Sequence, residues 1–193
     1  METSNEYLRT DEIRELVEAL RKVAQELESA PTDNYAWKWA IIAMQNAVQN
    51  AIVAAISGTD QLGALTKKAA REWLEAYEQD RTDYPEPWLA GFMELYGRAK
   101  SRTGFPATPE IDKDIASLVG FRNSFIHFTP KGWSIHLAGL PRILRNALSV
   151  VEHLGWKGHI LWYDEPDQVA AQASVERIHR ALAALEALYS PKT

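Results

Sequence analysis

Apolar residues recur at every third or fourth position along most of this chain, which is the spacing of one face of an α-helix. The first such segment follows Thr10, a residue type that caps helices, and ends before Pro31, which cannot continue a helix. A helix with one apolar face is stable only when other elements cover that face, so the spacing predicts a helical bundle. The first stripe consists of Ile13, Leu16, Val17, Leu20, Ala24 and Leu27.

The same period predicts further helices downstream. Thr108 and Pro109 give the strongest start signal, because a capping residue is followed by a proline at the first helical position. Residues 133–137 alternate apolar and polar side chains, which is typical of a short extended piece, and one isolated strand does not make a sheet. Helices are expected at 33–58, 62–77, 88–100, 109–128 and 141–155, and around 178–188, with a loop rich in aromatic residues at 156–167.

The composition favours one soluble, all-α domain of about seven helices over residues 1–193. Hydrophobic residues make up 46% of the chain, which suffices for one sizeable core. The most apolar window, from Tyr35 to Ile56, carries Lys38 and several amides in its interior, so we expect a buried helix rather than a membrane span. No basic segment followed by an apolar run opens the sequence. We therefore expect no signal peptide and a cytoplasmic protein.

Charge and cysteine content exclude several classes of function. The net charge of −5 argues against a protein that coats DNA or a membrane surface, because such binding needs clustered Lys and Arg. The absence of cysteine excludes disulfide scaffolds, thiolate zinc sites and thiol nucleophiles. The five histidines form no His-x3-His pair, so we expect no metal site and no cofactor.

The segment from 121 to 128, Phe-Arg-Asn-Ser-Phe-Ile-His-Phe, carries a combination of side chains suited to a phosphodiester. Asn123 and His127 are four positions apart, so on a helix they stack on one face, and the long side chain of Arg122 can reach the same place. A guanidinium can fork onto phosphate oxygens, and an imidazole can move a proton near neutral pH. His127 precedes Pro130 in the expected final turn, where the negative end of the helix dipole favours its charged form.

These residues resemble the R-x4-H signature of HEPN domains, which are all-α bundles with the motif on a late helix. The resemblance includes a polar residue directly after the arginine, here Asn123. It extends to the sequence following the motif, as far as Trp133 and Ile135, and to Trp-Lys-Trp-Ala at 37–40, and it covers roughly residues 33–154. The wider pattern looks like that of uncharacterised bacterial proteins related to HEPN.

The resemblance implies a metal-independent endoribonuclease, or a non-catalytic relative of one. It assigns His127 as general base or acid, Arg122 as the group that stabilises the phosphoryl oxygens, and Asn123 as an orienting residue. It also implies a homodimer in which the motifs of both copies line a shared cleft that binds RNA. A toxin or defence setting, with an antitoxin or another partner protein, would fit such an enzyme.

Other interpretations of the motif stay open. A HEPN-type dimer without catalysis would use the same face to bind a partner protein or a nucleotide, and a purely structural role would leave Arg122 bridging carboxylates or carbonyls. Lys131 and Arg142 lie close in sequence to the motif and are candidates for substrate binding, although such residues are more often solvated surface. A locally basic cleft in this acidic chain would be built most simply by pairing two copies.

Amides repeat at helical spacing inside the apolar segment 35–56. Gln45 and Gln49 stack on one face, and so do Asn46 and Asn50. We expect these amides to hydrogen-bond across a helix pair, because buried amides must be paired, and the alternative is a pocket that receives a base. The seven tryptophans are expected to serve core and interface packing rather than base stacking.

Overall fold

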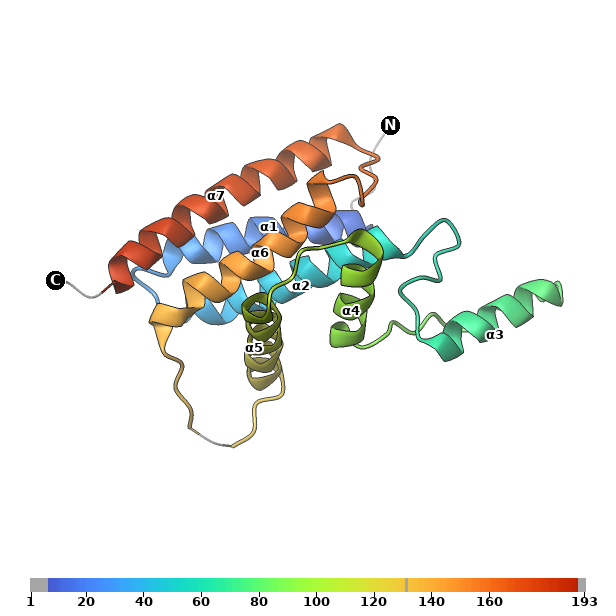
Figure 1. Ribbon diagram of the computed structural model, residues 1–193, viewed down its shortest axis with the longest axis horizontal. Coiled ribbons are helices and arrows are strands. Elements are labelled where there is room, and N and C mark those ends of the chain that lie inside the picture. Colours follow the sequence, from blue (N-terminus) through green and yellow to red (C-terminus); the bar gives the residue numbers. More distant parts are fainter. Residues whose placement is uncertain (1–6, 131, 191–193) are drawn as a thin grey trace.

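The computed structural model describes residues 7–130 and 132–190, and these residues form seven α-helices and one short 3₁₀ helix (Figure 1). The protein is therefore an all-α helical bundle, as the apolar spacing predicted. In the described ranges, extended pairing is limited to a single bridge between Leu65 and Leu89. The elements are α1 (Glu12–Ser29), α2 (Ala36–Ile56), α3 (Lys67–Glu78), α4 (Phe92–Thr103), α5 (Pro109–Ile126), η1 (Leu137–Gly139), α6 (Leu140–Trp156) and α7 (Glu165–Tyr189).

Helix α2 is the centre of the bundle. It packs against α1, α4, α5 and α6, and α7 closes the far side by packing on α1 and α6 (Figure 1). By length and composition α2 is apolar enough to cross a membrane, but it is surrounded by other helices. Its burial on several faces explains why its apolar residues do not form a single stripe, and marks it as a core helix.

Helix α5 carries the R-x4-H motif, and its start follows the predicted signal. The Thr108 hydroxyl accepts a hydrogen bond from the backbone N–H of Ile111 at 3.2 Å, with Pro109 in the first turn. Ile115 and Leu118 are fully buried where α5 packs on α2 and α6. Arg122 follows Leu118 by four residues and therefore lies on the same face of α5, so this packing fixes its position relative to the bundle.

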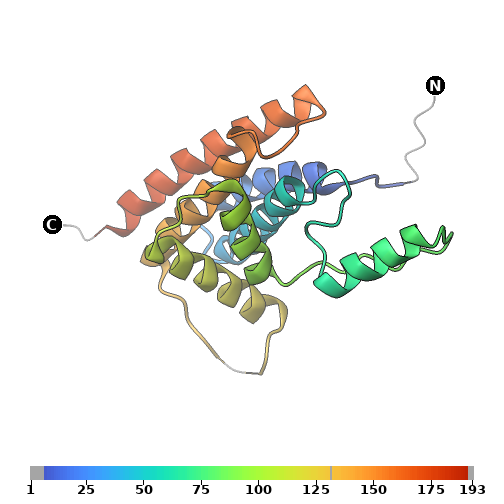
Figure 2. The same ribbon diagram turned by 45° about the vertical axis from the view of Figure 1, so that its right-hand side comes forward.

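Helix α3 forms an arm that extends away from the bundle (Figures 1 and 2). The start of the helix and the chain before it form a separate small apolar cluster, which includes Leu62, Leu65 and Ala69. The base of the arm is held by Arg98, whose guanidinium donates to the carbonyl of Leu65 at 2.7 Å. Gly63 permits a close approach there, because a Cβ at this position would lie 1.8 Å from the carbonyl oxygen of Ile56.

Several expected boundaries were wrong by a few residues. Asp11, not Thr10, caps α1, because the Asp11 carboxylate accepts from the N–H of Arg14 at 2.8 Å while the Thr10 hydroxyl donates to Glu15 at 2.6 Å. Helix α3 begins at residue 67 rather than 62, since Thr66 caps it.

The remaining differences arise at the base of the arm and in the connection after α5. Helix α4 begins at residue 92 rather than 88, because residues 88–90 pair with residues 64–66 through two backbone hydrogen bonds of 2.8 and 3.0 Å. The alternating segment is irregular chain over 132–136, followed by η1, and forms no strand. Helix α6 continues one residue beyond Gly155.

Candidate functional site

Arg122 lies near the end of α5 as a half-buried cation. Its Nη1 donates to the Oδ1 atom of the neighbouring Asn123 at 3.1 Å. Its Nε is buried and has no hydrogen-bond partner, and the guanidinium forms no ion pair within the described residues. The guanidinium therefore has donor groups that no acidic side chain of the described residues occupies.

Arg122 and Asn123 line a pocket of about 400 Å³ between α2, α4 and α5. Gln45 and Gln49 form the wall on α2, and the first turn of α4 forms another. The volume falls within the range of roughly 300–1,000 Å³ that small-molecule sites occupy. The remaining lining residues are Gly91, Phe92, Met93, Glu94 and Val119.

The two glutamines were expected to hydrogen-bond across a helix pair, and this expectation was wrong. Gln45 Nε2 donates to Gln49 Oε1 at 3.0 Å along α2 itself. The side chain of Gln45 is only 4% exposed, and its Oε1 has no partner. Both residues line the pocket, and the alternative that such a pocket receives a base stays a prediction.

The start of α4 adds further donors to the pocket. Its N-cap is Gly91, which has no side chain to accept from the first-turn N–H groups. Glu94 also lines the pocket, but its carboxylate is paired with Arg98 at 2.5 Å. The pocket thus combines a guanidinium that is not ion-paired in the described part of the chain, side-chain amides and the positive end of a helix.

His127 lies directly after the last residue of α5, rather than within the final turn. Its backbone N–H donates to the carbonyl of Asn123 at 2.8 Å, and its φ and ψ of −106° and 56° are not helical. The imidazole is exposed and does not line the pocket that Arg122 and Asn123 share. The structure therefore brings two of the three predicted catalytic residues together, and places the third beside them on the surface.

An apolar groove of about 450 Å³ lies on the other side of the motif. Phe125 and Phe128, which flank His127 in sequence, form part of its wall, and Phe128 is 59% exposed. Ile126, next to the histidine, is 47% exposed. The other residues of the groove are Asn34, Tyr35, Trp37, Lys38, Gly132, Trp133, Ile135, Leu137 and Leu140.

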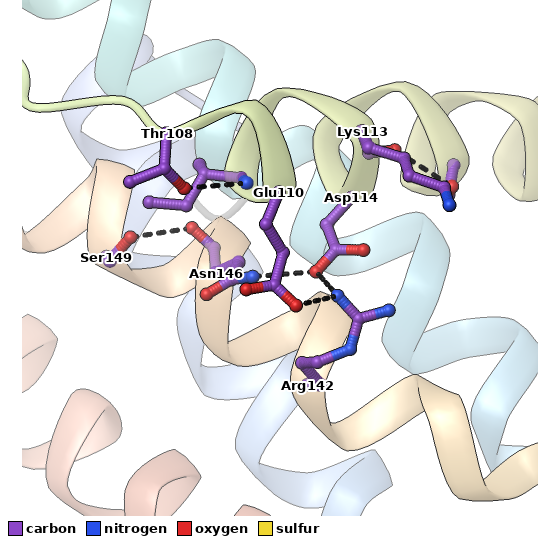
Figure 3. Close-up of polar contacts among 9 residues, drawn as sticks. Thr108, Glu110, Lys113, Asp114, Arg142, Asn146 and Ser149 are labelled. Carbon is purple, nitrogen blue, oxygen red and sulfur yellow. Dashed lines mark hydrogen bonds and ion pairs between the residues drawn. The ribbon is translucent and has the colours of Figure 1, made fainter.

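Of the two predicted substrate-binding residues, Arg142 does not join this site. Arg142, on α6, pairs with Glu110 at 3.0 Å and with the buried Asp114, near the start of α5 (Figure 3). Asn146 also donates to Asp114 at 2.6 Å, so these groups form a structural contact between α5 and α6. Lys131 lies outside the described residues.

The described part of the chain contains no group of three or more His, Cys, Asp or Glu side chains placed to hold a metal ion. Comparisons with models of known protein families, with curated proteins and with solved structures found no match to this chain.

Proposed function

We propose that this protein is a HEPN-like endoribonuclease that cleaves RNA phosphodiesters without a metal ion. One observation carries the proposal: an arginine that forms no ion pair with the described residues and an exposed histidine lie five residues apart, at the end of a helix in an all-α bundle. Neither side chain is saturated by hydrogen bonds within the described residues. Both are therefore free to contact a substrate.

The roles follow from the chemistry of each group. His127 takes the proton of a ribose 2′-OH while that hydroxyl attacks the adjacent phosphate. The protonated imidazole then gives a proton to the leaving 5′ oxygen. Arg122 stabilises the negative charge that develops on the phosphoryl oxygens, and Asn123 holds the guanidinium through its 3.1 Å hydrogen bond. The products are a 2′,3′-cyclic phosphate and a 5′-OH.

Purified protein incubated with labelled RNA in EDTA tests this proposal. His127→Ala and Arg122→Ala should each lower the cleavage rate by about 100-fold or more, since acid–base and charge-stabilising groups each contribute on this scale. Matched controls are His136→Ala, at an exposed histidine outside α5, and Arg71→Ala on the α3 arm; both should cleave as the wild type does. Equal cleavage by the two motif variants and the wild type would contradict the assignment.

A second candidate function is favoured by the apolar groove. A non-catalytic module would use the exposed aromatic residues around His127 to bind a second copy or a partner protein, such as an antitoxin. Under this proposal the face around Phe128 associates while RNA incubated with the protein stays intact. The proposed ribonuclease also associates, so association alone does not distinguish the two functions. Cleavage of RNA in EDTA does distinguish them.

A further inference from the structure

We propose that the pocket between α2, α4 and α5 is a binding site for a phosphate monoester. Its walls present polar groups that the protein itself leaves without partners. Within the described residues, the Nε of Arg122 and the Oε1 of Gln45 are both buried and unpaired, and they belong to residues of different helices that line the same pocket. Buried polar groups are nearly always paired, so two orphans at one pocket indicate a missing ligand.

Gln45 fits an anionic ligand once its amide orientation is considered. The oxygen and nitrogen of a side-chain amide can be exchanged without changing its shape. If Gln45 and Gln49 both turn over, Gln49 Nε2 donates to Gln45 Oε1 and their mutual hydrogen bond of 3.0 Å is kept. The unpaired atom of Gln45, a residue that lines the pocket, then becomes an N–H donor. The buried amide thus supplies a donor without losing its existing bond.

The first turn of α4 supplies the second set of donors. Phe92, Met93 and Glu94 line the pocket, and the backbone N–H groups at these positions have no acceptor within the helix. Gly91 precedes them with extended φ and ψ of −60° and 147°, so the N-cap position is correct but lacks a capping side chain. An oxyanion seated there would take the place of the cap.

The donor set fits a phosphate monoester better than other anions. Arg122, Gln45, Asn123 and the first turn of α4 all offer N–H groups. A monoester has three free oxygens and nearly two negative charges, whereas a phosphodiester or a carboxylate has two free oxygens and one charge. The single carboxylate in the lining, that of Glu94, is offset by Arg98. The phosphate comes either from the 5′ end of an RNA or from a small phosphorylated molecule.

The inference shares Arg122 with the proposed ribonuclease but does not depend on cleavage. Binding is measured by calorimetry in EDTA with probes that cannot be cleaved by 2′-OH attack. The probes are a short 2′-O-methyl oligonucleotide with a 5′-phosphate, the same oligonucleotide with a 5′-OH, glycerol phosphate, and acetate. The two sources of phosphate are distinguished by comparing the oligonucleotide with glycerol phosphate.

Gly91→Asp is the decisive variant, because it separates folding from binding. A carboxylate at this N-cap should raise the melting temperature by capping α4. It should also weaken binding of the phosphorylated probe by about tenfold or more, because it occupies the anion site and repels the phosphate. Gly91→Ala is its matched control: a Cβ there meets nothing within 4 Å, so binding should persist. Arg122→Gln should weaken binding similarly, because it removes the charged donor from the pocket lining.

The wild type should bind at least one phosphorylated probe about tenfold or more tightly than the 5′-OH oligonucleotide and acetate. Absence of binding by both phosphorylated probes, equal binding of acetate, or undiminished binding by Gly91→Asp would each overturn the inference. If the protein cleaves RNA but binds no phosphorylated probe, the proposed ribonuclease function stands and only the phosphate-binding inference is overturned. If it binds a phosphorylated probe but cleaves no RNA, the phosphate-binding inference stands and the ribonuclease function is overturned.

Discussion

Tyr96 illustrates how a single side chain ties α4 to α5. It is 2% exposed, and its hydroxyl donates to Asp112 at 2.8 Å. Lys100 donates to the same carboxylate at 2.9 Å. Burial, followed by the contact with Asp112, raises the pKa of the Tyr96 hydroxyl well above its ordinary value. The hydrogen bonds from Lys100 and then Tyr96 lower the pKa of Asp112.

Tyr96→Phe tests this contact through the pH dependence of stability. Above pH about 10 the tyrosine of the unfolded chain loses its proton while the folded one keeps it, so the wild type should lose stability as pH rises from there. The variant should be about 0.5–1.5 kcal/mol less stable at pH 7, and this difference should shrink above pH 10. Urea unfolding from pH 7 to 11 measures both effects.

Tyr77→Phe is the control, because Tyr77 is 62% exposed on the α3 arm. An alkaline loss of stability that is equal in Tyr96→Phe and the wild type would show that Tyr96 does not cause it. On the acid side, the lowered pKa of Asp112 means that its contribution is present above pH about 4 and is lost as pH falls toward the folded value.

At the scale of the element, α3 can be treated as an appendage. The arm leaves and rejoins the bundle where the N–H of Thr66 donates to the carbonyl of Trp88 at 2.8 Å. Its apolar cluster is separate from the main core, so its removal should not uncover that core.

Replacing residues 67–87 with a short Gly-Ser linker should therefore change the free energy of unfolding by no more than about 1 kcal/mol. Circular dichroism should show the loss of one 12-residue helix, with cooperative melting retained. Failure to fold, or a loss of several kcal/mol, would show that the arm supports the bundle after all.

The arm also shows what sequence could and could not predict among the elements. Helical spacing and the Thr108–Pro109 start are local signals, and they placed α5 and most of α2 correctly. The starts of α3 and α4 were misplaced because pairing between residues 64–66 and 88–90 depends on chain more than 20 positions away. A local periodicity contains no information about such contacts.

The candidate site divides in the same way. Arg122, Asn123 and His127 could be singled out because they are neighbours in sequence. The first turn of α4 was missed because Gly91 has no side chain that a sequence pattern could point to. It lines the same pocket as Arg122 only as a result of tertiary packing. The glutamines of α2 were noticed by their helical spacing, but their pairing with one another, rather than with another helix, depends on the three-dimensional setting.

At the scale of the whole molecule, charge is the main constraint on an RNA substrate. The net charge is −5, and the basic residues Arg142 and Arg145 near the motif in sequence are already paired with carboxylates on other helices. These two arginines are thus not free to neutralise a phosphate backbone near the motif. Two copies joined at the apolar groove would bring two His127 side chains to one interface, and we infer that the proposed ribonuclease requires such a dimer.

Phe128→Asp tests this inference, because it places a charge on an exposed aromatic position in the groove wall. In sedimentation experiments at tens of micromolar, the wild type should have twice the 21.8 kDa monomer mass, and the variant should dimerise about tenfold or more weakly. Tyr77→Asp, at a similarly exposed aromatic residue on α3, should leave the dimer intact. If the wild type cleaves RNA, Phe128→Asp should lose cleavage in parallel with dimerisation. A monomeric wild type, or a Phe128→Asp variant that dimerises as the wild type does, would exclude the groove as the dimer interface.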